Sequence, residues 1–364
     1  MLPNFTVEFS TKDDEFEMKK IVLSYYLPQF HEVEENNLWW GKGFTEWTKI
    51  NQAVAYSKFH EIRKPVQPLG QYNLLDKNII EKQYGIANEH GIDGFLIWNY
   101  WFGKGEKLLE KPLELILKEN INVKYCLAWA NHSWLNKTKG ILLKEQKYLG
   151  KEDYIEYFNY LLPFFKNKNY IKKDNKPVFL IFRPQDIPDL NDFMSIFDEL
   201  ARKNELAGVH WIAENTDRDA EYVDKFDGFL NSGKFLNLRR YKTLTFIKEK
   251  INNFTKGRFK LGPFFYSYKR MMMLEKNLKN SSGEIPVIFS GWDTSIRHAT
   301  NGIVLNEFDS QVFNEHVSHN LNFESDFLIV KSWNEWAEGN LLEPDSIYGF
   351  TMLKVMKEAL RKYD

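Results

Sequence analysis

Short apolar runs recur along the chain, separated by longer stretches in which apolar residues follow helical spacing. Each run is only a few residues long and largely apolar throughout, which is typical of strands buried on both faces of a parallel sheet. The eight runs span residues 21–27, 94–98, 123–130, 178–182, 209–213, 226–230, 287–289 and 327–330. The sixth, 226–230, is the weakest, because Asp227 and Gly228 interrupt it.

The stretches between these runs predict amphipathic helices. Six of them span residues 78–90, 107–118, 152–165, 192–204, 308–320 and 349–362, and the stretch 241–280 predicts one or two more with a loop. Eight strand–helix alternations in one chain of 364 residues favour a closed (β/α)8 TIM barrel with long βα loops over an open doubly wound sheet. We assign residues 1–18 to an N-terminal extension and 19–364 to the barrel domain.

Composition narrows the classes of partner. The chain has 49 basic and 50 acidic residues, so its net charge gives no electrostatic reason to expect nucleic acid or an anionic membrane as the main partner. The first 20 residues lack the basic and apolar regions of a signal peptide, and no apolar run approaches the roughly 18 residues needed for membrane insertion. The one cysteine, Cys126, excludes an intrachain disulfide. We therefore expect a soluble, cytoplasmic protein.

Aromatic residues make up 16% of the chain, and they concentrate where a barrel places its chemistry. Active sites of such barrels lie at the C-terminal ends of the strands and in the loops that follow. Ten of the eleven tryptophans fall there, and Asn, Asp and Glu accompany them in tails such as "AWANHSW" and "SWNEWAEGN". Indole rings pack on the C–H faces of sugars, while amides and carboxylates bind the hydroxyls. The pattern favours a glycan site, and the alternative is an aromatic rim that only closes the barrel.

The residues that we expect to contact a glycan share this placement after the predicted strands. They are Tyr26, Trp40, Glu46, Trp47, Trp98, Tyr100, Trp101, Trp129, Asn131, Trp134, Glu214, Trp292, Asp293, Trp333, Asn334 and Trp336.

Two glutamates, Glu335 and Glu338, stand where the eighth strand gives way to a turn before Gly339. In a helical turn, positions three apart place their Cβ atoms roughly 5–6 Å from each other. Paired carboxylates are the usual apparatus of glycoside hydrolysis, and a short separation accompanies retention of configuration. Like charges and indole neighbours also raise one pKa, so that one carboxyl keeps its proton and can act as an acid. The alternative is a pair of exposed acids near the start of the last helix.

Other kinds of site find little support. The eight histidines show no metal-ligand spacing, and neither "GKG" segment is a P-loop. No Gly-x-Gly-x-x-Gly follows a predicted strand, so a nucleotide-sugar site of Rossmann type is not indicated. We expect no metal and no organic cofactor.

Several motifs together resemble a known family. The stretches "YYLPQFH", "WWGKGFTEW", "GIDGFLIWNYWF", "AWANHSW" and "SWNEWAEGNLLEP" are similar to those of WbsX-type proteins from bacterial surface-polysaccharide loci. These proteins are in turn similar to glycoside hydrolase family 99. The resemblance runs from Ile21 to about Phe350 and implies a (β/α)8 barrel without a cofactor.

The resemblance also implies a reaction. Family 99 enzymes are retaining endo-α-mannosidases in which the substrate's own 2-hydroxyl attacks C1 and gives a 1,2-anhydro sugar. The family's Glu-x-x-Glu spacing matches Glu335, as the residue on the 2-hydroxyl, and Glu338, as the acid/base at the leaving oxygen. Ala337 stands where the family often has His, so the sugar is not carried over. A glycosyltransferase, a transglycosylase or a non-hydrolytic glycan-binding barrel remain the alternatives.

Overall fold

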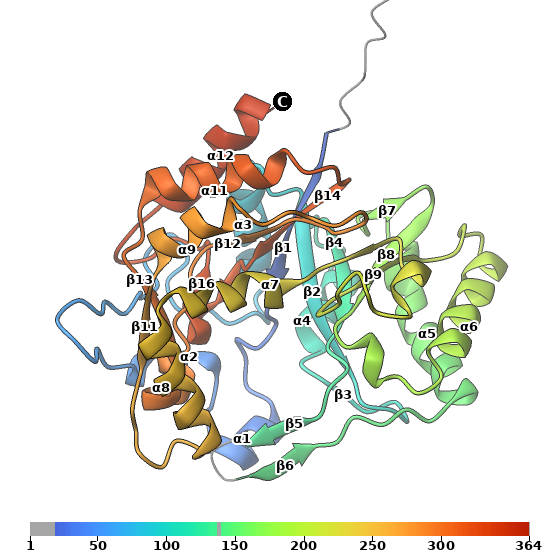
Figure 1. The fold of residues 1–364 in the computed structure, drawn as a ribbon. Helices are drawn as coiled ribbons and strands as arrows, with labels where there is room; N and C mark the ends of the chain where they lie inside the picture. The colour runs from blue at the N-terminus through green and yellow to red at the C-terminus, as the bar shows by residue number, and fades with distance from the viewer. Residues whose placement is uncertain (1–18, 137–139, 364) are drawn as a thin grey trace, which may run out of the picture.

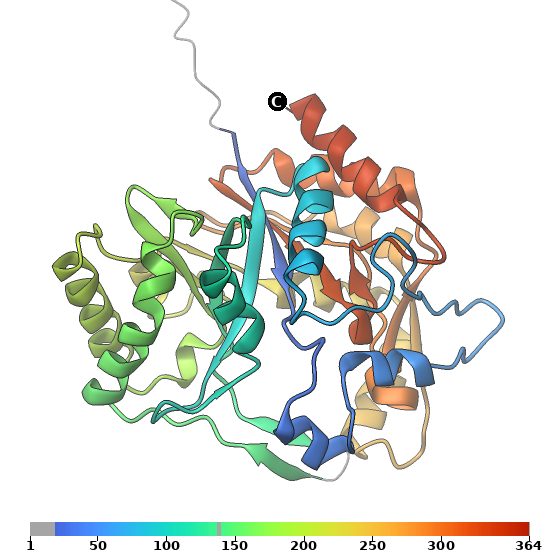
Figure 2. The same ribbon diagram turned by 180° about the vertical axis from the view of Figure 1, so that it is seen from behind.

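A curled parallel sheet, wrapped by helices, forms the centre of the molecule, and Figures 1 and 2 show it from opposite sides. The computed structural model describes residues 19–136 and 140–363, so the expected extension at 1–18 lies outside the described residues. None of the helices within those ranges is long and apolar enough to cross a membrane.

All eight predicted apolar runs form strands of this sheet, in the order β10-β9-β8-β4-β2-β1-β14-β12. The strands are β1 (Ile21–Tyr26), β2 (Gly94–Trp101), β4 (Tyr125–Trp129), β8 (Lys176–Ile181), β9 (His210–Ala213), β10 (Gly228–Phe229), β12 (Val287–Phe289) and β14 (Phe327–Lys331). Neighbouring strands pair in parallel, and β4 is buried along its whole length, as continuous apolar sequence predicts. The first and last long strands, β1 and β14, lie side by side.

The two edge strands of the sheet, β10 and β12, share no ladder of paired residues. They approach each other through an isolated parallel bridge between Phe229 and Glu284, just before β12. The Phe229 amide donates to the Gly283 carbonyl (3.0 Å), and the Ile285 amide donates to the Phe229 carbonyl (2.8 Å). The sheet is therefore a curled one of eight parallel strands with a single bridge between its edges.

Helices cover the outer face of the sheet. They are α3 (Lys77–Glu89), α4 (Lys111–Lys118), α5 (Lys151–Lys166), α6 (Leu190–Lys203), α11 (Ser310–Leu321) and α12 (Thr351–Tyr363), close to the six that were predicted. On α6, Phe193, Phe197 and Ala201 recur every four residues and are buried, so this stripe faces the sheet. The helix predicted from residue 107 begins only at Lys111, because 107–108 pair with β2 and Leu109 has φ of 61°.

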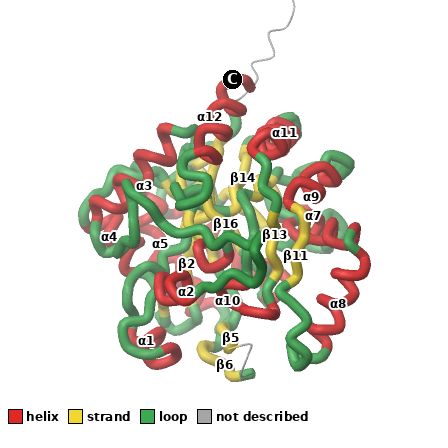
Figure 3. The backbone as a smooth tube through the Cα atoms, turned by 90° about the vertical axis from the view of Figure 1, so that its left-hand side faces the viewer, coloured by secondary structure: helices red, strands yellow, loops and turns green. Residues whose placement is uncertain are grey.

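The long stretch before β12 contains more than the predicted helices. It folds as α7 (Ser232–Asn237), α8 (Thr243–Phe254), β11 (Phe264–Ser267) and α9 (Tyr268–Glu275). Strand β11 was not predicted, and it pairs in parallel with β13 (Ile303–Asn306) in a separate small sheet. Figure 3 shows α8 at the outer edge of the molecule beside this pair.

The loops at the C-terminal ends of the strands carry further short elements. They are α1 (Glu34–Trp40), α2 (Glu46–Gln52), α10 (Ser295–His298), and the antiparallel strands β5 (Trp134–Asn136) and β6 (Ile141–Lys144). In Figures 1 and 3 these elements lie at the end of the molecule opposite α12. The remaining short elements are β3 (Lys107–Leu108), β7 (Lys172–Lys173), η1 (Pro184–Asp186), η2 (Val223–Lys225), η3 (Leu238–Tyr241) and η4 (Ala299–Asn301).

Candidate active site

The two glutamates of the "SWNEWAEGN" segment lie on one tight turn after β14. The turn consists of β15 (Asn334–Glu335), the 3-10 turn η5 (Trp336–Glu338) and β16 (Asn340–Leu341). Gly339 ends η5 with φ of 57°, and a Cβ atom at this position would lie 2.5 Å from the Cβ atom of Asp293. Only glycine fits both constraints, so the turn predicted before Gly339 is present and its geometry is fixed.

A guanidinium group joins two of the expected acids. Nη1 of Arg297 lies 3.1 Å from Oε1 of Glu338, and its Nη2 lies 3.1 Å from Oε2 of Glu46. Arg297 comes from α10, whereas Glu46 is buried in the first turn of α2. The planar fork of arginine suits such double carboxylate binding, so Arg297 holds two loops from opposite ends of the chain together.

Glu335 is half-buried beside this cluster, and its environment favours the protonated form. Burial raises its pKa to about 8, helped by the charges of Glu338 and Glu46 and opposed by Arg297. The same acids lie close enough to Tyr100 on β2 to raise the pKa of its hydroxyl, after the larger effect of burial. One carboxyl of the pair therefore has a raised pKa, as expected, but it is Glu335, whereas the resemblance to family 99 gives the role of the acid to Glu338.

A second charged cluster lies across the inner side of the sheet. Glu214, at the end of β9, is fully buried, pairs with Lys331 and accepts a hydrogen bond from the Tyr25 hydroxyl. Oγ of Ser232 donates to the same carboxylate at 3.1 Å. Strands β1 and β9 are separated by three others, so the contact between Tyr25 and Glu214 must cross the concave face. The Tyr25 ring also stacks on Trp98, with centroids 4.7 Å apart.

Tyr26, which we expected to contact a sugar, lies on the other face of β1. Its hydroxyl donates to Gln83 of α3 at 2.7 Å, between the sheet and its helical cover. Neighbouring residues of a strand point to opposite faces, so Tyr25 takes the inward position and Tyr26 does not.

A buried carboxylate that the sequence did not single out lies behind the turn. Glu343 accepts hydrogen bonds from Nε1 of Trp336 (2.6 Å), Nε2 of Gln83 (2.7 Å) and the Tyr72 hydroxyl (2.9 Å). Burial raises its pKa to about 7, and these three donors oppose that effect. Glu343 thus connects Trp336, which follows Glu335 on the turn, to Gln83 of α3 and to Tyr72.

Asparagines that we expected to contact a sugar bind the backbone instead. Asn334 accepts from the Leu27 amide (2.7 Å) and donates to the Leu27 carbonyl (3.1 Å). Asn131 makes the same pair of bonds with Arg183, at 2.8 Å each. Each amide therefore ties two strand ends together at the mouth of the sheet.

The expected aromatic contacts divide by exposure. Four rings reach the surface. Trp40 is 40% exposed, and the half-buried ones are Trp98, Trp134 and Trp292. The others are buried: Trp47, Tyr100, Trp101, Trp129, Trp333 and Trp336. Two buried indoles satisfy their N–H on backbone carbonyls, Trp47 on Tyr72 (2.7 Å) and Trp129 on Trp101 (3.0 Å). Five of the ten tryptophans at this end are therefore buried in the protein, where a sugar could not stack on them.

Trp292 and Asp293 line a separate cavity behind the turn. Its volume is about 80 Å³, and Arg63 and Gly339 also line it. Asp293 accepts from Nε2 of His60 (2.8 Å) and from Oγ of Ser295 (2.6 Å). These partners hold Asp293 against the back of the turn rather than beside Glu335.

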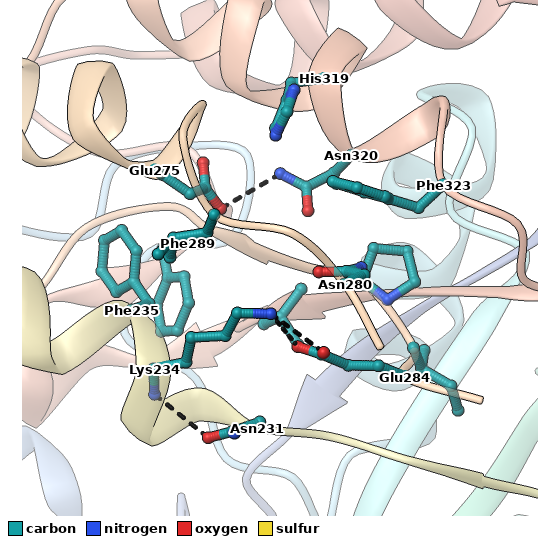
Figure 4. A pocket seen from close by; sticks show the side chains of 14 residues that line it. Asn231, Lys234, Phe235, Glu275, Asn280, Glu284, Phe289, His319, Asn320 and Phe323 are labelled. Atoms are coloured by element: carbon teal, nitrogen blue, oxygen red, sulfur yellow. Dashed lines mark hydrogen bonds and ion pairs between the residues drawn. The ribbon is translucent and has the colours of Figure 1, made fainter. Parts of the chain in front are cut away.

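Another cavity, of about 30 Å³, lies among α7, β12 and α11, as Figure 4 shows. Lys234 pairs there with Glu284 at 3.0 Å, and Asn320 donates to Glu275 at 3.3 Å. This volume has room for about one or two water molecules. None of the expected site residues lines it, so it is separate from the candidate active site.

Comparison with known sequences identifies the family of the chain. The sequence profile of the family described as "Glycosyltransferase WbsX" matches residues 22–356. The chain belongs to the WbsX family. It is also similar to the protein WxcX of Xanthomonas campestris pv. campestris, at 26% identity for strain B100 and 25% for a second strain. Each match covers 94% of this chain and 50% of WxcX, so the chain spans about half the length of these relatives.

Solved structures resemble this WbsX-family chain in fold. Two structures of the GH99 endo-α-mannosidase from Bacteroides thetaiotaomicron match with TM-scores of 0.58 and 0.57, at 15% and 13% identity. Each covers 94% of this chain and 97% of the enzyme. A glycoside hydrolase-like protein matches with a TM-score of 0.57 and 15% identity, over 95% of both chains. The WbsX fold is thus similar to that of GH99 enzymes.

A metal site finds no support among the described residues. Among residues 19–136 and 140–363, no group of three or more His, Cys, Asp or Glu side chains has an arrangement that could hold a metal ion.

The raised pKa of Glu335 predicts that the difference in stability between the wild type and a Glu335→Gln variant depends on pH. Below its ordinary pKa of 4.5, this carboxyl is protonated in both the folded and the unfolded chain and has no effect. Between 4.5 and about 8 the unfolded chain releases the proton more readily, so the folded state loses stability as pH rises. The Glu335→Gln variant should therefore be more stable than the wild type by at least about 1 kcal/mol at about pH 9, and by much less at about pH 5.

Thermal unfolding of both proteins across this pH range measures the difference. Glu358→Gln, at an exposed position of α12, is the matched control and should show no such trend. A difference between Glu335→Gln and wild type that is constant with pH would contradict the prediction.

The network around Glu343 predicts a large cost for its removal. Glu343→Ala leaves three buried donors without their acceptor, so it should lower the free energy of unfolding by at least about 2 kcal/mol. Glu358→Ala, which removes an exposed carboxylate, should change it by less than about 0.5 kcal/mol. Chemical denaturation measures both, and equal losses would show that Glu343 is not held as described.

Proposed function

We propose that this WbsX-family protein is a retaining α-glycosidase, similar to endo-α-mannosidases, that acts on a bacterial surface or related glycan. The observation that carries the proposal is the placement of Glu335 and Glu338 on one rigid turn at the mouth of the sheet, with Glu335 at a raised pKa. Paired carboxyls in this arrangement serve glycoside hydrolysis. The similarity of the fold to a GH99 endo-α-mannosidase supports the same reading.

In the proposed reaction the substrate's 2-hydroxyl is the nucleophile. Glu335 takes its proton, the 2-oxygen forms a bond to C1, and the bond from C1 to the leaving oxygen breaks as Glu338 protonates that oxygen. Water then adds to C1 and gives a proton to Glu338, while the 2-oxygen leaves C1 and regains its proton from Glu335. Each carboxyl returns to its starting form, and no bond to the enzyme is made.

The raised pKa of Glu335 bears on these roles. A carboxylate whose conjugate acid has a pKa near 8 is a stronger base than an ordinary glutamate, which suits removal of a hydroxyl proton. Arg297 binds both Glu338 and Glu46 and so holds the carboxyl of Glu338 in place beside α2. The half-buried rings of Trp98 and Trp134 are the surfaces that we propose for stacking on the sugar.

We extend the proposal to the architecture around the site. The bridge between Phe229 and Glu284 supports closure of the curled sheet into a (β/α)8 barrel. We propose that residues 19–364 act as one catalytic domain, because one large core cluster includes residues from β1 to α12. The buried, unpaired thiol of Cys126 is compatible with the reducing cytoplasm, where we propose that the protein acts.

A glycosyltransferase is the second candidate, since the family description names that activity. A transferase that uses a nucleotide-sugar needs groups that hold a diphosphate, usually backbone amides at a glycine-rich turn or a bound cation. The candidate site instead places the carboxylates of Glu46 and Glu338 on one arginine, so the cluster has a net negative charge, which repels a diphosphate.

Replacement of either glutamate should remove activity without unfolding the chain. Glu335→Gln and Glu338→Gln keep the side-chain shape but cannot exchange a proton, so each should lower kcat by at least about 1,000-fold. Release of reducing ends from a panel of α-linked mannose-containing glycans measures this, with Glu358→Gln as the control. A variant of either glutamate that keeps near wild-type kcat would exclude the assigned role.

The pH profile of the wild type separates the two carboxyls. With a substrate whose leaving group departs without protonation, such as an aryl glycoside of an activated phenol, only the base must be in its required form in the free enzyme. If Glu335 is that base, kcat/KM rises with pH up to about 8. A profile that is flat through pH 8 would exclude Glu335 as the base.

Calorimetric titration separates hydrolysis from transfer. We expect no heat of binding with nucleoside diphosphates or nucleotide-sugars, with or without magnesium, because the net negative charge of Glu46, Glu338 and Arg297 together repels the diphosphate. Micromolar binding of a nucleotide-sugar would favour the transferase.

A further inference from the structure

Helix α8 packs against the protein with its polar side. Glu249, on that side, is buried and accepts from Nη2 of Arg239 (3.1 Å) and from the Tyr266 hydroxyl (2.7 Å). Asn252, also buried, donates to Oδ1 of Asn301 at 2.9 Å. The contacts that attach α8 to the rest of the molecule are therefore hydrogen bonds and an ion pair.

The opposite side of α8 is apolar and faces outward. Leu244 is 77% exposed, Ile247 48%, Ile251 46% and Phe254 90%. At 3.6 residues per turn, these four positions fall within about 80° of one another around the helix. A surface helix normally buries such a stripe, so α8 is inverted with respect to the usual pattern. Phe259 and Leu261 extend the apolar surface into the following loop, at 62% and 42% exposure.

Positive charge surrounds this stripe. Between residues 239 and 261 the only acid is Glu249, which is buried and paired with Arg239. Lys248 and Lys250 flank the stripe on its two sides, at helical positions about 40° from its nearest members. The exposed cations of this segment are Arg240, Lys242, Lys248, Lys250, Lys256, Arg258 and Lys260. The net charge of −1 for the whole chain averages over this surface and conceals it.

We propose that α8 and the loop 255–261 dock on the surface of an anionic lipid bilayer. A helix with an apolar stripe between basic residues lies in the plane of a membrane, with its apolar side chains among the lipids and its cations on the headgroups. The arrangement of α8 matches this on both counts, and the docking buries a stripe that the fold leaves in water. No part of the chain crosses the membrane in this proposal.

Two other occupants fit the surface less well. A second copy of the chain would bring the same seven exposed cations against each other, and like charges disfavour such an interface. Nucleic acid would pair with the cations, but its phosphates offer nothing to the leucine, isoleucine and phenylalanine side chains. An anionic bilayer satisfies both kinds of side chain.

The docking surface adjoins the candidate active site. α8 binds Asn301 in η4, and this segment directly follows α10, which carries Arg297. Figures 1 and 3 show α8 near the end of the molecule that carries α1, α2 and α10. Docking through α8 would therefore hold the mouth of the sheet close to glycans at a membrane surface, whichever reaction the site performs.

Vesicle flotation tests the proposal without any assay of activity. The wild type should float with vesicles of phosphatidylglycerol and phosphatidylcholine at low ionic strength, and should not float with phosphatidylcholine alone. Raising the salt concentration should weaken binding, because the headgroup attraction is screened.

Three double variants locate the surface. Lys248→Glu with Lys250→Glu should lower the partition coefficient at least about tenfold, and so should Leu244→Ser with Phe254→Ser. Lys354→Glu with Arg361→Glu makes the same charge change at exposed positions of α12, and should leave the partition within about twofold of wild type. All six side chains are exposed, so melting temperatures should stay close to that of the wild type.

Several outcomes would overturn the proposal. They are absence of flotation, equal flotation on both kinds of vesicle with no dependence on α8, and equal loss in the α12 control. A dimer that the Leu244 and Phe254 substitutions dissociate, with no vesicle binding, would assign the stripe to self-association. Binding of single-stranded DNA in place of vesicles would assign the cations to nucleic acid.

Discussion

The arrangement of the candidate site depends on one guanidinium group. Burial, and after it the charges of Glu338 and Glu46, raise the pKa of Glu335, and repulsion among these acids opposes folding unless a cation offsets it. Arg297 supplies that cation and binds two of the three acids. Because these residues come from α2, α10 and η5, the ion pairs also set the relative positions of three loops. Behind them, Glu343 and Gly339 fix the backbone of the turn.

The division between the parts that the sequence predicted and the parts that it did not has physical causes. All eight strands of the sheet were predictable, because a strand buried on both faces is apolar throughout. Because such a strand is apolar on both sides, its sequence does not show which side chains face inward. Tyr26 was therefore predicted to contact a sugar, whereas Tyr25 lies on the inner side. Strand β11 was missed because it has only four residues and lies within a stretch whose pattern was interpreted as helical.

The candidate site was predictable in its acids and less so in their partners. The spacing of Glu335 and Glu338 indicated a shared turn, but an arginine in a short helix such as α10 carries no local signal of the carboxylates it binds. Polar side chains at strand ends were read as ligand contacts, and Asn131 and Asn334 instead satisfy backbone groups there. Two of the buried tryptophans, Trp47 and Trp129, likewise satisfy their N–H groups on backbone carbonyls.

The pairing of β1 with β14 has a consequence for when the site comes into existence. Arg297 and Glu46 are 251 residues apart in the sequence, and Glu335 and Glu338 follow the last strand of the sheet. The carboxylates can assemble only after residue 338 has left the ribosome and β14 has docked beside β1. A chain that stops before residue 335 would therefore lack both carboxyls of the pair, although the sheet up to β12 could already be present.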